Sequence, residues 1–310
     1  MAKHERARAF AAQPDPPAAK DFARLRASGQ AAGVSRAIGG GFVAARNALA
    51  GRLVRLGVAP NHLTFFGFLM TVGAGYCLAR GASQQVPYFV GAAGPIGWWP
   101  LAAAGFLILG GASDMLDGAV ARLGRQNTAF GAIFDSVLDR CSDMAMFLGC
   151  AAHFAWHGNL TYQTLAVVAL ANAIIISYTK ARAENLIPDC SPGYWTRPER
   201  VAAMLIGCLV GHVPAVLWQL AILSALTAWR RVWFTWRATA AQAAGRPLPP
   251  TGPGSGRWSR LLLWRYPRGS IPYDLVTGLN IAYIIFAARL WPQLLATGDA
   301  ADPLGRWLGR

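Results

Sequence analysis

Long apolar segments alternate with short polar stretches through the middle of the chain, and this pattern predicts its architecture. A helix that crosses the hydrocarbon core of a bilayer needs about 20 predominantly apolar residues. Most of the segments approach or exceed that length, while the fifth is shorter and is separated from the sixth by Pro214. We therefore predict an all-α integral membrane protein. The six predicted transmembrane helices lie at about 62–79, 99–118, 132–155, 160–179, 199–212 and 214–236.

The segment that precedes these helices has a different composition. Residues 1–34 are rich in Ala, Arg and Pro, lack an apolar run of signal-peptide length and are predicted to form a disordered basic tail. Residues 35–57 mix apolar side chains with arginines, which suits a helix lying in the membrane interface, although Arg46 falls near its apolar stripe. The predicted membrane domain therefore comprises residues 35–237.

Beyond the membrane domain the composition changes again. Residues 238–270 are rich in proline, glycine and arginine and are predicted to be a linker. Residues 271–310 are predicted to be a C-terminal apolar helix and tail, with an apolar run that Asp274, Asn280 and Arg289 interrupt. The run suits a seventh span, and equally an interfacial helix or a helix that packs against a partner.

Composition and charge support a membrane protein. Hydrophobic residues make up 54% of the chain and charged residues 14%, whereas a soluble domain has about 25% charged residues. The net charge of +15 is typical of proteins that bind nucleic acid or an anionic membrane surface. Several long uncharged apolar runs are foreign to soluble nucleic-acid binders, so we expect membrane lipids as partners and no nucleic acid.

The basic residues also predict the topology. Cytoplasmic loops carry an excess of Lys and Arg, and here the cations crowd the N-terminal 57 residues, the loop after Arg122, the stretch Lys180–Arg200 and the chain after Arg230. The opposite loops, at about 80–98, 156–160 and 211–214, carry only Arg80. We expect a multi-pass protein of the cytoplasmic membrane with both ends of the six-helix core in the cytoplasm.

Four carboxylates stand out in the second and third predicted spans. Asp114 and Asp117 are three residues apart, and Asp135 and Asp139 are four apart, so each pair shares one face of its helix. A short loop joins the two helices, which places both pairs at the cytoplasmic side. Carboxylates gathered there would repel unless cations join them, and Mg²⁺ uses such ligands together with substrate phosphates. Asp143, one turn further on, is either a supporting or a structural residue.

The neighbours of these aspartates suit a phosphate-containing ligand. Gly118 and Gly131 remove side chains where a backbone and a nucleotide come close. Ala121 is small on the same stripe, and Arg122 can meet phosphate oxygens. Singly, such an aspartate is more often a helix cap or a solvated ion-pair partner, and intramembrane carboxylates also suit a cation transporter.

These residues together resemble the signature of the CDP-alcohol phosphotransferase (phosphatidyltransferase) family, DxxDGxxAR, eight residues, GxxxDxxxD. Every fixed position matches, and the resemblance covers residues 35–237. The matching residues are Asp114-Met-Leu-Asp117-Gly118-Ala-Val-Ala121-Arg122 and Gly131-Ala-Ile-Phe-Asp135-Ser-Val-Leu-Asp139.

The resemblance implies a six-helix membrane fold, a homodimer and two divalent cations, Mg²⁺ or Mn²⁺. It implies that Asp114, Asp117 and Asp135 are metal ligands, and that Asp139 is both a ligand and the general base. Pro60-Asn61-His62-Leu63-Thr64 resembles the family's PNxxT entry to the first helix, near the cytidine. The implied CDP-lipid contacts are Asn61, Thr64, Gly118, Ala121, Arg122 and Gly131, although Asn61 and Thr64 also suit a helix start.

A second basic group resembles one subgroup of this family. Ser177-Tyr-Thr-Lys180-Ala-Arg182-Ala-Glu184, Arg197-Pro-Glu-Arg200 and the DRxSD sequence at 139–143 resemble the phosphatidylinositol phosphate synthases and their archaeal-lipid relatives. The positive-inside rule alone also accounts for cations at these loop ends. The resemblance implies an acceptor pocket lined by Ser177, Lys180, Arg182, Arg197 and Arg200, with Arg230 or Arg231 as a further candidate.

The resulting expectation is an enzyme of phospholipid biosynthesis that transfers a phosphatidyl group from a CDP-linked lipid to a phosphorylated polyol and releases CMP. Inositol 1-phosphate is the expected acceptor, and glycerol 3-phosphate or serine are alternatives within the family. A cation transporter and a non-catalytic scaffold are the alternatives from other classes. Because the motifs end before residue 240, we expect a chain that stops near Arg237 to keep its activity.

Overall fold

The computed structural model describes residues 34–88, 95–248, 266, 268–290, 292 and 302–309. In these residues all regular secondary structure is helical, and an isolated β-bridge joins Gln85 and Ile96. The predicted tail falls outside the described residues except for its last residue, and the central part of the predicted linker, 249–265, falls outside them as well.

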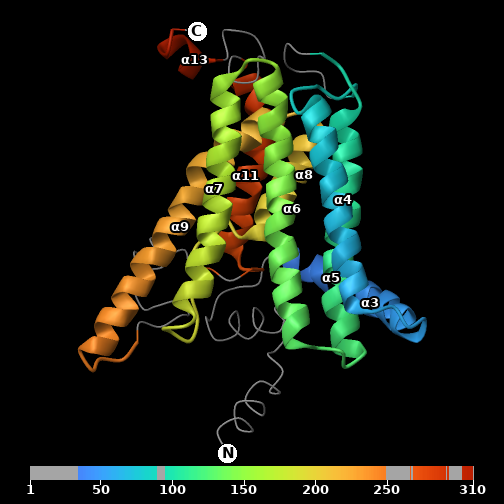
Figure 1. Ribbon diagram of the computed structural model, residues 1–310, viewed down its shortest axis with the longest axis vertical. Coiled ribbons are helices and arrows are strands. Elements are labelled where there is room, and N and C mark those ends of the chain that lie inside the picture. Colours follow the sequence, from blue (N-terminus) through green and yellow to red (C-terminus); the bar gives the residue numbers. More distant parts are fainter. Residues whose placement is uncertain are drawn as a thin grey trace, which may run out of the picture.

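A bundle of six helices forms the body of the molecule, and successive helices run in opposite directions (Figure 1). Each of the six predicted apolar segments is confirmed as a helix. Four of the helices, α4, α5, α7 and α9, are long and apolar enough to cross a membrane. The bounds are α4 Pro60–Gly81, α5 Trp99–Leu123, α6 Ala129–Trp156, α7 Leu160–Ala183, α8 Arg197–Val210 and α9 Val213–Ala243.

The ends of these helices follow from local capping residues. The Thr128 side chain accepts a hydrogen bond from the backbone N–H of Gly131 at 2.9 Å, and so begins α6. The Asn159 side chain accepts from the N–H of Tyr162 at 3.0 Å at the start of α7. Gly211 ends α8 with a φ of +72°, a conformation that favours glycine. The short α8–α9 loop therefore reverses the chain at this point.

Helix α4 packs closely against both α5 and α6, and two glycines make the approach to α6 possible. A Cβ atom on Gly75 would lie 2.3 Å from the carbonyl oxygen of Ala145, and one on Gly149 would lie 2.1 Å from the carbonyl oxygen of Gly75. Small residues at helix contacts let backbones approach in this way. The contact fixes α4 beside the helix that carries Asp135 and Asp139.

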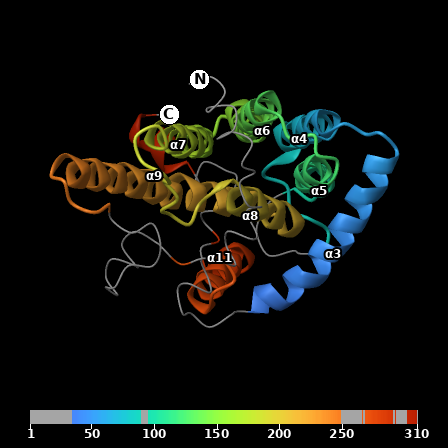
Figure 2. The same ribbon diagram turned by 90° about the horizontal axis from the view of Figure 1, so that it is seen from below.

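Helix α3 (Val34–Arg55) lies at an angle to the bundle, near the end where α4 begins and α5 ends (Figures 1 and 2). Its Ala50 is fully buried and packs with Ala119 and Val120 of α5. The predicted helix before the first span is therefore present, and it packs on α5, whose last turn contains Arg122.

Two further helices follow the bundle. Helix α11 (Ile271–Leu290) lies along α8 (Figure 2), and its Ile284 is buried in the main core. Helix α13 (Pro303–Trp307) lies at the end of the bundle where α7 begins (Figure 1). There Asp302 accepts hydrogen bonds from the N–H of Thr161 at 2.9 Å and of Leu160 at 3.2 Å. The C-terminal apolar run thus packs on the chain's own bundle.

Candidate active site at the ends of four helices

Three of the four predicted metal-ligand aspartates form one cluster between α5 and α6. Asp114, Asp135 and Asp139 each offer a carboxylate oxygen, and these oxygens lie within 4.8 Å of one another. Oδ1 of Asp135 is buried and has no hydrogen-bond partner among the described residues. An orphaned buried carboxylate oxygen is costly, and a divalent cation would satisfy it, so the cluster fits a metal site.

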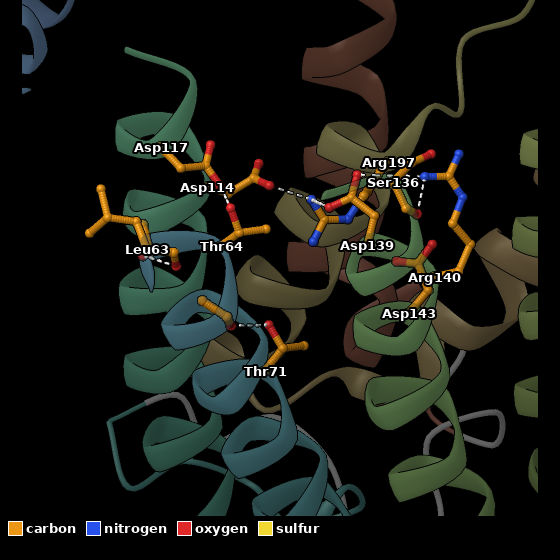
Figure 3. Close-up of polar contacts among 12 residues, drawn as sticks. Leu63, Thr64, Thr71, Asp114, Asp117, Ser136, Asp139, Arg140, Asp143 and Arg197 are labelled. Carbon is orange, nitrogen blue, oxygen red and sulfur yellow. Dashed lines mark hydrogen bonds and ion pairs between the residues drawn. The ribbon is translucent and has the colours of Figure 1, made fainter. Parts of the chain in front are cut away.

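Asp117, the fourth aspartate, is held by the start of α4. The Thr64 hydroxyl donates to Oδ2 of Asp117 at 2.8 Å, and both side chains are buried (Figure 3). One turn earlier on α5, the Ser113 hydroxyl donates to the carbonyl oxygen of Leu63 at 2.7 Å. These two hydrogen bonds tie α4 to α5 beside the aspartates. Thr64, predicted as a nucleotide contact or a helix-start residue, therefore orients an aspartate in this structure.

A single arginine joins the aspartate cluster from α8. Nη1 of Arg197 lies 2.9 Å from Oδ1 of Asp114 and 2.7 Å from Oδ1 of Asp139 (Figure 3). Arg140 lies on the other side of Asp139, with Nη1 3.9 Å from Oδ2, and donates to the carbonyl oxygen of Ser136. The Arg197 guanidinium thus links three helices and places positive charge at the carboxylates.

The predicted CDP-lipid residues lie around the same cluster. The Arg122 guanidinium folds back over Gly118, since a Cβ there would lie 3.2 Å from Nη1 of Arg122. A Cβ at Gly131 would lie 3.3 Å from Oδ1 of Asn61, so the start of α6 and the start of α4 meet at this glycine. Ala121 lies half-buried on α5 next to Arg122.

The predicted acceptor residues divide into separate groups. Lys180 and Arg182 are exposed at the end of α7, where Nζ of Lys180 lies 3.8 Å from Oε1 of Glu184. Ser177 is half-buried one turn earlier. Arg231 is buried on α9 and donates to the carbonyl oxygen of Ile176 at 2.7 Å. Among the predicted acceptor residues, Arg197 contacts Asp114 and Asp139 of the aspartate cluster.

Arg200 has a different environment from Arg197. It is 1% exposed, its Nη2 lies 2.5 Å from Oδ2 of Asp143, and its Nη1 donates to the carbonyl oxygen of Trp195 at 3.3 Å. This buried ion pair connects α6 with α8 and argues against direct contact between Arg200 and a soluble ligand. Asp143, which the sequence left as either a supporting or a structural residue, therefore has a structural role in this ion pair.

The sequence reasoning missed the partners of Thr64 and Arg200, although the spacing held a signal. Asp143 follows Asp139 by four residues and Arg200 follows Arg197 by three, so each pair occupies one helix face. Because Arg197 contacts Asp139, the next turn of each helix brings Arg200 to Asp143. Equal offsets of about one turn along the two helices therefore give two ion pairs, one after the other.

Comparison with known proteins identifies the class. Residues 57–242 match the family model described as CDP-alcohol phosphatidyltransferase. The chain therefore belongs to the CDP-alcohol phosphatidyltransferase family, and it is a transferase with several apolar helices of membrane-spanning length.

Two relatives with curated names are synthases of inositol phosphate lipids. The chain is 34% identical over 189 residues to the archaetidylinositol phosphate synthase of Methanothermobacter thermautotrophicus, which covers 59% of this chain and 86% of that protein. It is 31% identical over 200 residues to the phosphatidylinositol phosphate synthase of Mycobacteroides abscessus, covering 62% and 83% respectively.

Solved structures of the Mycobacterium tuberculosis phosphatidylinositol phosphate synthase share the fold. One, in complex with manganese and citrate, matches with a TM-score of 0.54 and 27% identity over 68% of this chain and 96% of that one. Another, with CDP-DAG bound, matches with a TM-score of 0.52 and 28% identity over 62% and 93%.

Proposed function

We propose that this chain transfers the phosphatidyl-type group of a CDP-linked lipid to a phosphorylated polyol, inositol 1-phosphate, and releases CMP. The observation that carries the proposal is the Arg197 guanidinium within 2.9 Å of both Asp114 and Asp139. It sets a phosphate-binding cation directly beside a carboxylate cluster that suits metals. The relatives named as inositol phosphate synthases support the choice of acceptor.

The aspartates divide between charge neutralisation and proton transfer. Asp114, Asp117, Asp135 and Asp139 would hold two divalent cations, Mg²⁺ or Mn²⁺, which would supply positive charge against the donor's pyrophosphate. Asp139 takes the proton of the acceptor hydroxyl as that oxygen forms its bond to phosphorus. General-base assistance of this kind contributes typically about 10²–10⁴-fold. The bond from the same phosphorus to the bridging oxygen breaks, and CMP departs.

Basic and small residues position the two substrates. Arg122, folded over Gly118, pairs with a phosphate of the nucleotide. Gly131, which has no Cβ, lets Asn61 lie against the start of α6, and Asn61 contacts the cytidine from there. Arg197 contacts the acceptor phosphate. Further contacts to the acceptor come from α7, from Ser177, Lys180 and Arg182. Arg200 supports the first turn of α8 through its ion pair with Asp143.

We place the chain in the cytoplasmic membrane as a six-span homodimer with the site facing the cytoplasm. Helix α6 counts as a span because its charged residues lie between Asp135 and Asp143, toward the site, and the residues that follow are apolar apart from His153. Helix α8 has 14 residues, about 21 Å at the usual rise, and its charged first turn lies at the site rather than in lipid. The arginines of α3 suit the interface at the same end.

An acceptor panel tests the proposal. Purified protein with CDP-diacylglycerol is supplied with inositol 1-phosphate, free inositol, glycerol 3-phosphate or serine, with and without EDTA, and CMP release is measured. We expect transfer to inositol 1-phosphate that EDTA abolishes and Mg²⁺ or Mn²⁺ restores. Faster transfer to free inositol or serine would overturn the phosphate-binding role of Arg197.

The role of Asp139 has its own test. The variant Asp139→Asn keeps the shape of the side chain but cannot take a proton, so kcat should fall by at least about a hundredfold. Binding of CDP-diacylglycerol, measured by calorimetry in the presence of Mn²⁺, should change far less. A variant that turns over normally with both substrates saturating would remove Asp139 from the role of base.

A further inference from the structure

The C-terminal helix α11 is fastened to the first turn of α8 by a polar network around Glu199. The Glu199 side chain is 6% exposed, and its Oε1 lies 2.8 Å from Nη2 of Arg268. The same oxygen accepts the Tyr273 hydroxyl at 2.8 Å. Nη2 of Arg268 also donates to Oγ1 of Thr196 at 2.9 Å. Arg268 lies just before α11 and Tyr273 lies in its first turn, so the network joins the start of α11 to the start of α8.

Glu199 is an integral part of the beginning of α8. Thr196 immediately precedes the helix, and its hydroxyl donates to Oε2 of Glu199 three residues later. The two residues occupy the positions of a capping box, but here their side chains bond to each other and Thr196 makes no cap hydrogen bond to the helix backbone. Arg268 and Tyr273 therefore hold two side chains that flank the first turn of α8.

The same turn carries the arginine of the site. Arg197 lies between Thr196 and Glu199 in sequence, and its guanidinium reaches Asp114 and Asp139. A small rotation of this turn moves a long side chain by more than the backbone shift, because Nη1 lies at the far end of the arginine. The direction of Arg197 consequently depends on how firmly Glu199 is held.

Apolar packing between α8 and α11 is incomplete near this network. The two helices border a cavity of about 320 Å³ whose apolar lining includes Ala203, Ile206 and Ile281. Where side chains do not interdigitate, packing alone specifies the relative position of two helices poorly. The polar contacts of Glu199, and the hydrogen bond from Tyr194 to Thr277 at 2.9 Å, supply that specification.

We propose that Arg268 and Tyr273, which lie beyond the family-matched residues 57–242, are positioning residues that hold Arg197 toward the acceptor by gripping Glu199. This inference rests on the proposed function. It reverses the expectation that a chain ending near Arg237 keeps its activity, because such a chain lacks Arg268 and Tyr273 and leaves Glu199 with Thr196 alone among these partners. In this protein, α11 belongs to the acceptor side of the site.

The test uses the full-length protein and separates the two substrates. In Arg268→Ala we expect the acceptor KM to rise about tenfold while the KM for CDP-diacylglycerol changes less than about twofold. Tyr273→Phe, which removes only a hydroxyl, should raise the acceptor KM by a smaller factor. Arg268→Lys should recover part of the loss, because a lysine still offers Glu199 a cation.

The control is Gln219→Leu on α9. It removes the hydrogen bond from Gln219 to Asn280 of α11, 2.6 Å long, and leaves the first turn of α8 untouched. We expect both KM values to match the wild type. If Arg268→Ala and Tyr273→Phe also match the wild type, or if they raise both KM values equally, the proposal is overturned.

The role of Arg268 can be tested separately from the identity of the acceptor. If the wild type prefers glycerol 3-phosphate, Arg268→Ala should still raise the KM of that acceptor, so a wrong acceptor would not by itself contradict the positioning role. In an Arg197→Gln background, Arg268→Ala should add little, because it acts through Arg197. The Arg200 amide donates to the carbonyl oxygen of Thr196 at 3.1 Å. Its hydrogen should exchange faster in Arg268→Ala without any substrate, and unchanged exchange would contradict the proposed grip.

Discussion

Replacing Arg200 by methionine should destabilise the protein strongly, and the reason lies in Asp143. The two side chains are 1% and 5% exposed, and Nη2 of Arg200 lies 2.5 Å from Oδ2 of Asp143. Arg200→Met leaves the carboxylate buried without its counter-ion. Removing one partner of a buried ion pair costs about 3–5 kcal/mol. At about 2–4 °C per kcal/mol, the range for domains of 150–250 residues, the melting temperature should fall by about 6–20 °C.

The matched double variant, Asp143→Leu with Arg200→Met, should recover most of that loss. Apolar residues of similar volume often replace a buried ion pair at no cost. The pair here is also incompletely satisfied, because Oδ1 of Asp143 and Nε of Arg200 are buried without partners in the described part of the chain. We therefore expect the double variant to melt within a few degrees of the wild type.

The assay compares thermal unfolding in one detergent at a fixed scan rate, followed by the acceptor KM of each folded variant. If Arg200 only supports α8, the double variant should regain a near-normal acceptor KM. If Arg200 contacts the acceptor directly, as the family resemblance implies, the KM of the double variant should stay raised. A melting temperature for Arg200→Met equal to that of the wild type would refute the argument from the buried charge.

Two further predictions concern regions away from the site. Gly149→Ala should lower the free energy of unfolding by about 1–3 kcal/mol, because the added Cβ would lie 2.1 Å from the carbonyl oxygen of Gly75. The control variant Gly105→Ala, at a position with open space around it, should not lower it, and thermal unfolding compares the two variants. Burial raises the pKa of Asp302, but hydrogen bonds, the largest from Thr161, outweigh it and hold the pKa below its usual value. The stability that Asp302 adds is therefore fully present above about pH 4 and is lost as the pH falls through the lowered pKa. The Thr161 amide should consequently stay protected from hydrogen exchange between about pH 5 and 8. The variant Asp302→Asn should weaken that protection at pH 7.

The bundle was predictable from the sequence because each helix carries its own local signals. The long apolar runs set the number and order of the helices, and the residues that cap them are adjacent in sequence, as with Thr128 before α6 and Asn159 before α7. The meeting of Asp114 with Asp135 and Asp139 was equally accessible. Spacings of three and four residues and one short loop leave two antiparallel helices little other choice.

The partners of the arginines were not predictable in the same way. Arg197 and Arg200 are three residues apart in one basic motif, and the sequence alone predicts the same role for both. Only the crossing of α8 over α5 and α6 sends Arg197 to Asp114 and Asp139, and buries Arg200 against Asp143. The position of α11 depends likewise on long-range contacts, such as Tyr273 with Glu199, which no local pattern encodes.

The position of the charges along the helices distinguishes a transferase from a cation transporter. A transport path places carboxylates near the bilayer midplane, often on broken helices. Here α5 and α6 are continuous through both aspartate pairs, and Asp135 lies near the start of α6. Arg197 also places a fixed positive charge within 2.9 Å of two of the carboxylates. That charge opposes the passage of a cation and attracts a phosphate, and an enzyme whose donor has acyl chains in the bilayer and whose acceptor is in water needs such a site at the membrane surface.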